Sequence, residues 1–185
     1  MAILIRTATP DDAQVLATIH VLAWQAGYRG LLPDSVLDGL SVETRTARWQ
    51  VWLAGSVTRT RVAEQDDQVK GWLTTGPQRD EDLDAATVAE IYALYVHPAA
   101  WGAGCGSALM HAALDELAAH GYAVATLWVL RGNARAIRFY EYLGFRADGA
   151  TKNDVGPGGA VLDEIRLRYV LARRDVGETL PTDLV

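Results

Sequence analysis

The sequence predicts a mixed α/β fold in which a central sheet is covered by helices. Two observations support this prediction. Strand-like apolar stretches alternate with amphipathic helical stretches through the second half of the chain, an order that favours a mixed sheet flanked by helices. The 185 residues, half of them hydrophobic, are also enough for one compact domain with a substantial core. We therefore expect a single domain over residues 1–172 and a polar tail over residues 173–185.

The first half is expected to contain one strand, two helices and a hairpin. Acidic residues after Pro10 favour a helix start, and Gly27 favours its end. Ser41 precedes the second helical stretch, and the hairpin turns at residues 65–68. The expected elements are a strand over 3–8, helices over 10–27 and 42–55, and strands over 60–64 and 70–75.

The second half is expected to alternate strands with helices. Gly121 and Gly144 each follow an amphipathic stretch and are typical helix-ending residues. Turn-forming residues are frequent over 148–159, so a loop is expected there. The other expected elements are strands over 88–96, 124–129 and 162–171, and helices over 104–120 and 133–143.

Composition excludes several functional classes. A net charge of −6 and a pI near 5.1 disfavour nucleic acid as a partner. A single cysteine rules out an internal disulfide and is typical of a reducing cytoplasm. The N-terminus lacks the pattern of a signal peptide, and no apolar run has membrane-spanning length. We expect a cytoplasmic protein without a membrane partner.

The stretch from Glu90 to Ser107 has the strongest chemical signal. An apolar run ends at Pro98, and glycines follow at positions 102, 104 and 106 before an amphipathic helix. Glycine frees the backbone to bend and lets a ligand approach its amides closely. A helix start adds free N–H groups and a positive dipole end. The pattern therefore predicts a phosphate site built from backbone.

Two familiar glycine motifs do not fit this loop. A mononucleotide P-loop ends in Gly-Lys followed by Ser or Thr, but neither Lys nor Arg occurs between residues 97 and 110. The dinucleotide fingerprint needs glycine at its first, third and sixth positions. Counted from Gly102 the sixth position is Ser107, and counted from Gly104 it is Leu109. A nucleotide-cofactor oxidoreductase is therefore disfavoured.

A second block, residues 133–145, completes the pattern. It reads Asn-Ala-Arg-Ala-Ile-Arg-Phe-Tyr-Glu-Tyr-Leu-Gly-Phe. With the glycine loop, it resembles the GNAT superfamily of N-acetyltransferases, whose members carry a Gln/Arg-x-x-Gly-x-Gly/Ala loop and a later Asn…Phe-Tyr…Gly-Phe block. Trp101 departs from this pattern, because it stands where the family prefers Gln or Arg.

The resemblance implies a mostly antiparallel sheet that splays between its fourth and fifth strands. It also implies direct transfer of the acetyl group of acetyl-CoA to a primary amine of a small molecule or peptide. The backbone of Leu94 and Val96 would pair with the pantetheine arm, and the Leu94 amide could polarise the acetyl carbonyl. The diphosphate would lie on the loop formed by Trp101, Gly102, Ala103, Gly104, Cys105, Gly106 and Ser107.

Two residues are candidates for catalysis. Glu90 opens an apolar strand and matches a family position that serves as general base, acting directly or through water; a solvated strand-edge Glu is the alternative. Tyr140 matches the family tyrosine that protonates the thiolate and would also touch the coenzyme; an aromatic packing residue is the alternative. Asn133 could cap its helix, bind the coenzyme, or do both. Cys105 is interpreted as a small packing residue, not a nucleophile.

The acceptor side is predicted to contain Trp24, Tyr28, Arg29 and Trp72. An acidic loop over 78–84 would suit a cationic amine, such as a polyamine, an aminoglycoside or a peptide amine. The alternative is that this loop is merely solvated and that the tryptophans and the tyrosine belong to the core. Arg29 would instead favour an acceptor with a carboxylate. The four histidines show no metal-ligand spacing, so no metal is expected. A homodimer is possible, and the alternative function is a non-catalytic module that binds acyl-CoA.

Overall fold

The structure is a computed structural model that describes residues 2–55 and 58–171. A seven-stranded sheet forms its centre, with the strand order β1-β2-β3-β4-β5-β7-β6. The strands are β1 (Leu4–Thr7), β2 (Arg59–Gln65), β3 (Gln68–Pro77), β4 (Val88–Val96), β5 (Val124–Leu130), β6 (Arg146–Val155) and β7 (Val161–Val170). The α-helices are α1 (Ala13–Gly27), α2 (Asp34–Asp38), α3 (Val42–Ala54), α4 (Cys105–Ala119) and α5 (Ala134–Tyr142).

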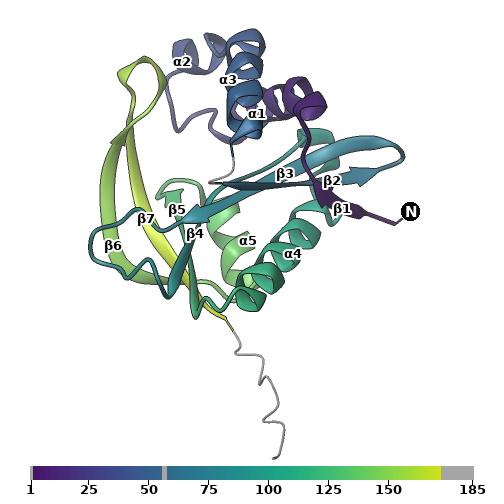
Figure 1. Cartoon of the computed structure of the whole chain (residues 1–185). Helices are drawn as coiled ribbons and strands as arrows, with labels where there is room; N and C mark the ends of the chain where they lie inside the picture. The colour runs from purple at the N-terminus through teal and green to yellow at the C-terminus, as the bar shows by residue number, and fades with distance from the viewer. Residues whose placement is uncertain (1, 56–57, 172–185) are drawn as a thin grey trace, which may run out of the picture.

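Helices cover both faces of the sheet (Figure 1). Side chains alternate along a strand, so neighbouring residues of β2 enter different cores. Val62 packs with α1 and α3, whereas Ala63 packs in the larger core that contains α4. The α1–α3 group therefore lies on one face, and α4 and α5 lie on the other.

The sheet opens between β4 and β5, which form its one parallel pair among the described strands. Their pairing runs only from Val88 opposite Val124 to Ile91 opposite Leu127. Beyond Ile91, β4 keeps only its partner β3, and a bulge at Tyr92 bends it there. The predicted mixed sheet with a splay between the fourth and fifth strands is confirmed.

Most predicted elements are confirmed to within a few residues at their ends, but the loop expected over 148–159 is wrong. Strand β6 occupies most of that range and pairs antiparallel with β7. Its turn-forming residues are tolerated because β6 is a largely exposed edge strand with a bulge after Ala147. The short helix α2 was not predicted. The predicted tail lies outside the described residues, so the domain boundary stays a prediction.

Over the described residues, no helix combines the length and apolar character that crossing a bilayer requires.

Candidate active site

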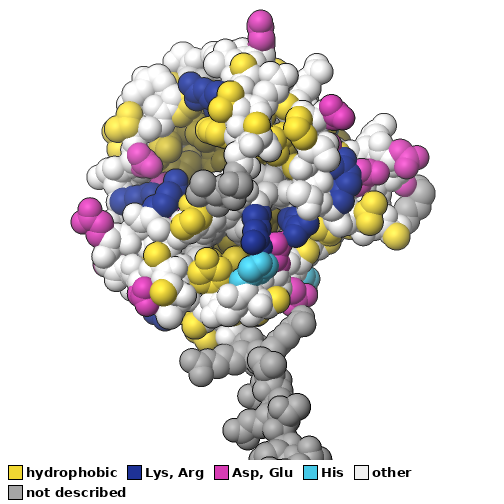
Figure 2. Space-filling model, in the orientation of Figure 1, with side chains coloured by type: hydrophobic (Ala, Val, Ile, Leu, Met, Phe, Trp, Pro, Cys, Tyr) yellow, Lys and Arg dark blue, Asp and Glu magenta, His cyan; other side chains and the backbone are white. Residues whose placement is uncertain are grey.

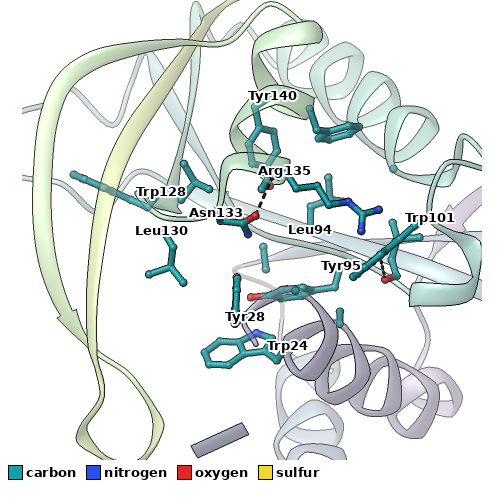
Figure 3. A pocket seen from close by; sticks show the side chains of 18 of the residues that line it. Trp24, Tyr28, Leu94, Tyr95, Trp101, Trp128, Leu130, Asn133, Arg135 and Tyr140 are labelled. Carbon is teal, nitrogen blue, oxygen red and sulfur yellow. Dashed lines mark hydrogen bonds between the residues drawn. The ribbon is translucent and has the colours of Figure 1, made fainter. Parts of the chain in front are cut away.

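A cavity of about 380 Å³ lies where β4 and β5 separate. Its walls come from α1, β4, the loop before α4, β5, α5 and β7. Figure 3 shows Tyr140 at the top of the space, Trp101 at the right, and Trp24 and Tyr28 at the bottom. Figure 2 shows the surface hollowed, with hydrophobic side chains exposed inside. The splay thus opens one cavity that reaches elements from both faces of the sheet.

The glycine loop forms one wall of this cavity. Gly102 and Gly104 have φ angles of +83° and +92°, which other L-residues rarely adopt. Gly104 is the N-cap of α4 and offers no side-chain cap. The first-turn amides of α4 therefore lack the usual side-chain acceptor and can receive an anion.

The members of the loop differ in what they face. Gly102, Gly104, Gly106 and Ser107 line the cavity, as do Leu94 and Val96 of β4. Ala103 is exposed and does not line it. Cys105 is fully buried in the core, where burial raises the pKa of its thiol. This placement agrees with a packing residue and not with a nucleophile.

Gly106 lies at a close contact between α4 and its neighbours. A Cβ at this position would lie 3.3 Å from Phe139 Cζ and 3.6 Å from Val96 Cγ2. A larger side chain would have to displace these groups or enter the cavity. The glycine therefore keeps the helix start open to a ligand.

Trp101 takes part in two contacts at the same end of the cavity. Its Nε1 donates a hydrogen bond to the Val96 carbonyl at 2.8 Å. The Arg135 guanidinium carbon lies 3.5 Å from the centre of the Trp101 ring, which is a cation–π contact. Both residues line the cavity. Sequence reasoning missed Arg135, although the missing Gln or Arg at position 101 was a signal to look for a cation elsewhere.

Tyr140 and Asn133 approach the cavity from α5 (Figure 3). Tyr140 is 9% exposed and packs against Phe139 and Phe145, and its burial raises the pKa of the phenol. Asn133 Oδ1 accepts a hydrogen bond of 3.1 Å from the Ala136 amide, so the predicted helix cap is confirmed. The rest of the Asn133 side chain remains at the cavity wall, where ligand binding stays a prediction.

Glu90 lies away from the cavity. It pairs with Thr126 across the closed part of the β4–β5 junction, before the strands separate. Its carboxylate is 1% exposed and accepts three hydrogen bonds from Arg79, at 2.5, 3.0 and 3.2 Å. Glu90 does not line the cavity, and its visible role is to anchor the segment that contains Arg79.

The four predicted acceptor residues separate into two groups. Trp24 and Tyr28 line the cavity. Trp72 is 2% exposed and donates to the Leu16 carbonyl within the core. Arg29 pairs with Asp34 and Asp38 at 3.0 and 2.8 Å, outside the cavity. The structure therefore brings only the first two to the site.

The acidic loop over 78–84 also does not line the cavity. Arg166 binds Asp80 at 3.1 Å and Asp82 at 2.7 Å. The Trp128 indole donates to Asp80 at 3.0 Å. These contacts hold the loop against β5 and β7. The negative charges of Asp80 and Asp82 therefore stabilise the position of the loop.

Sequence reasoning missed most of the side chains by which the strands line this cavity. They belong to β4, β5 and β7 and are Tyr92, Tyr95, Trp128, Leu130, Leu162 and Glu164. No local motif marks them, because their meeting depends on the splay and on strand order. Burial raises the pKa of Glu164, and Lys152 lies 3.6 Å from its carboxylate. In the described part of the chain, no cluster of three or more potential metal ligands occurs.

Comparison with known proteins identifies the family. The model of the acetyltransferase (GNAT) family matches residues 24–145. The uncharacterized N-acetyltransferase YuaI of Bacillus subtilis is 25% identical over 170 residues, covering 88% of this chain and 95% of that protein. An uncharacterized N-acetyltransferase of Archaeoglobus fulgidus is 32% identical over 136 residues, covering 74% of this chain and 88% of the relative.

Solved structures agree with this result. The yncA protein of Salmonella typhimurium, solved with its cofactor acetyl-CoA, has a TM-score of 0.67 at 25% identity and covers 97% of this chain and 100% of its own. The resemblance first indicated by the glycine loop and the 133–145 block is confirmed over most of the fold. The chain belongs to the GNAT family of acetyltransferases.

Proposed function

We propose that this protein transfers the acetyl group of acetyl-CoA directly to a primary amine of a small molecule or peptide. One observation carries the proposal: the uncapped start of α4 and the Tyr140 side chain belong to the same cavity. The first suits a diphosphate and the second suits a departing thiolate. Membership of an acetyltransferase family supports the assignment.

The residues present suit the coenzyme. Amides of residues 102–107 would hold the diphosphate, and Arg135 would add a positive charge beside them. The pantetheine arm would follow the edge of β4 that β5 leaves unpaired, along Leu94 and Val96. The Leu94 amide would then polarise the acetyl carbonyl.

The chemistry requires two proton transfers from the amine. The acceptor arrives as an ammonium ion at neutral pH and gives its first proton to a base. The neutral nitrogen attacks the thioester carbon and forms the C–N bond, and the C–S bond breaks as the adduct collapses. Tyr140 gives a proton to the thiolate, and the second proton of the nitrogen replaces it. The products are the amide, the free thiol of coenzyme A and one released proton.

The base that receives the first proton was predicted to be Glu90. Because Glu90 does not line the cavity, this role requires a chain of water molecules and stays a prediction. The cytoplasmic location and the homodimer also stay predictions.

Two measurements test the proposal. Acetyl-CoA should raise the melting temperature, whereas NAD should not; a ligand at one hundred times its Kd stabilises by about 2.7 kcal/mol. Thiol release from acetyl-CoA should then depend on added amine. Tight coenzyme binding without release for any amine would instead indicate a non-catalytic acyl-CoA-binding module.

A further inference from the structure

Glu164 is the one carboxylate that lines the cavity within residues 2–55 and 58–171. It lies on β7 opposite Leu130 of β5. Trp128 is two residues from Leu130 and therefore faces the same side of the sheet. Trp24 of α1 and Tyr28, which follows this helix, line the same cavity and lie at the bottom of the view in Figure 3. A single carboxylate thus lies among aromatic and aliphatic walls.

The Glu164 carboxylate also has fewer ionic contacts and hydrogen bonds than the carboxylates that Arg79 and Arg166 bind. Its ionic contact within the described chain is Lys152, with 3.6 Å between Nζ and Oε2. By contrast, Arg79 binds Glu90 through three hydrogen bonds, and Arg166 holds both Asp80 and Asp82. Glu164 therefore retains capacity to accept a hydrogen bond from a ligand.

Lys152 shows what this place can bind. Its ammonium lies 4.4 Å from the centre of the Trp128 ring and 3.6 Å from Glu164 Oε2. A primary ammonium is therefore accommodated between an aromatic face and a carboxylate, which is a favourable arrangement for cations. Lys152 comes from the edge strand β6 and remains partly exposed, so a ligand ammonium can share or take over its position.

We propose that Glu164 and the rings of Trp24, Tyr28, Tyr95 and Trp128 form the acceptor subsite, which takes small monoamines with an apolar or aromatic body. The ammonium pairs with Glu164, and the body packs against the rings. Glu164 then accepts the first proton of the ammonium. This inference rests on the proposed function, because it supplies the acceptor and the base for the same transfer.

The charges around the cavity exclude polycations as preferred acceptors. A polyamine or an aminoglycoside needs a carboxylate for each of several ammonium groups, and the cavity offers one. Two acidic residues of the 78–84 loop, Asp80 and Asp82, are held by Arg166 and do not line the cavity. Because the cavity of about 380 Å³ must also hold the end of the coenzyme, the acceptor is small.

The groups around Glu164 favour the transfer of a proton from the ammonium to its carboxylate. Burial raises the pKa of Glu164 and outweighs the effects of Lys152 and Arg79, which lower it, while Asp154 raises it further. The phenols of Tyr28 and Tyr95 also face the same space, and burial raises the pKa of both. A carboxylate whose pKa lies closer to neutrality is a better proton acceptor for an amine.

The test combines binding with turnover in the full chain. Glu164→Gln is compared with Glu164→Asp, and Asp163→Asn serves as control because Asp163 is an exposed neighbour paired with Arg131. Calorimetry measures binding of 2-phenylethylamine to the coenzyme A complex. Thiol release is measured with 2-phenylethylamine, tryptamine, spermidine and kanamycin across pH.

The proposal predicts at least tenfold higher kcat/KM for the two arylalkyl amines than for spermidine or kanamycin, a difference within the usual range for pocket recognition. Glu164→Gln should lower kcat/KM for 2-phenylethylamine about 100-fold and remove the acidic limb of its pH profile. Glu164→Asp should restore part of the activity. The KM for acetyl-CoA and the activity of Asp163→Asn should change less than about twofold.

The outcomes separate the two proposals. Transfer that proceeds normally in Glu164→Gln, or that prefers spermidine, overturns the subsite while the acetyltransferase function stands. Glu164-dependent binding of 2-phenylethylamine, together with an absence of thiol release for every amine tested, supports the subsite and overturns the function. If the arylalkyl amines neither bind to the coenzyme A complex nor cause thiol release, the proposed acceptor subsite is also overturned.

Discussion

The two ends of the cavity are built in different ways. The end proposed for the coenzyme uses the backbone of residues 102–107 and of Leu94 and Val96, with residues 133–140 beside it. The end proposed for the acceptor uses side chains from four elements: α1, β4, β5 and β7. A diphosphate is the same in every acyl-CoA and can be held by amides. An acceptor must be distinguished by side chains, and these come from distant parts of the chain.

Two glutamates of the same sheet also differ in whether they reach the cavity. Glu90 lies where β4 and β5 are still paired and is bound by Arg79. Glu164 lies beyond the splay, lines the cavity and faces Lys152 at 3.6 Å. The apparent match of Glu90 to a family position did not place it at the cavity, because side-chain position depends on where the strands separate.

The largest expected effect concerns the coenzyme end. Gly106→Val should abolish stabilisation by acetyl-CoA, because the new side chain meets Phe139 and Val96 or projects into the cavity. Thermal shift with and without acetyl-CoA measures this. Ala119→Val, at the exposed end of the same helix, controls for the lower helix propensity of valine. Normal coenzyme binding by Gly106→Val would contradict a backbone-built diphosphate site.

Tyr140→Phe tests whether Tyr140 donates the proton to the thiolate, between the two ends of the cavity. The ring keeps its packing against Phe139 and Phe145, but the proton donor is lost, so kcat should fall about 100-fold. Because burial raises the pKa of Tyr140, the phenol stays protonated across neutral pH. Acetyl-CoA affinity should not change.

Tyr142→Phe is the matched control, because Tyr142 lies on the same helix and is 85% exposed. Steady-state kinetics of the two variants should differ strongly. Equal turnover in both would remove Tyr140 from the proton path.

Glu90→Gln sharpens the comparison of the two glutamates. Loss of the charge-assisted bonds to Arg79 should cost about 1 kcal/mol of unfolding free energy, since Arg79 itself is largely exposed. If Glu90 only anchors the Arg79 segment, kcat should stay within about threefold of the wild-type value. Urea unfolding and the pH–rate profile measure the two effects. A lost acidic limb with unchanged stability would instead support the general-base hypothesis.

The smallest effect is expected at Asn133, where the cap and a ligand contact must be separated. Asn133→Ala removes the bond to the Ala136 amide and should lower the unfolding free energy by about 1 kcal/mol. Asn133→Ser keeps a capping oxygen and should restore that stability. If the Asn133→Ser variant nevertheless binds acetyl-CoA about tenfold more weakly, a loss of about 1.4 kcal/mol, the amide also contacts the coenzyme.

The sequence alone predicted the mixed sheet, the helix starts at Ser41 and Asn133, and the glycine loop before α4. These features depend on local patterns: hydrophobic periodicity, capping residues and backbone freedom. The family resemblance added the splay between β4 and β5. Strand β6 was missed because its many turn-forming residues conceal a strand pattern, and its pairing with β7 is not visible in the local sequence.

Only the tertiary structure decided which side chains share the cavity. Trp72 enters the core and Arg29 binds α2 residues, whereas Trp128 and Glu164 reach the site from strands that no motif connects to it. Likewise, Arg135 approaches Trp101 across the gap between α5 and the glycine loop. The physical reason is that a backbone site is encoded over a few consecutive residues, while a side-chain site depends on strand order, register and the point at which two strands part.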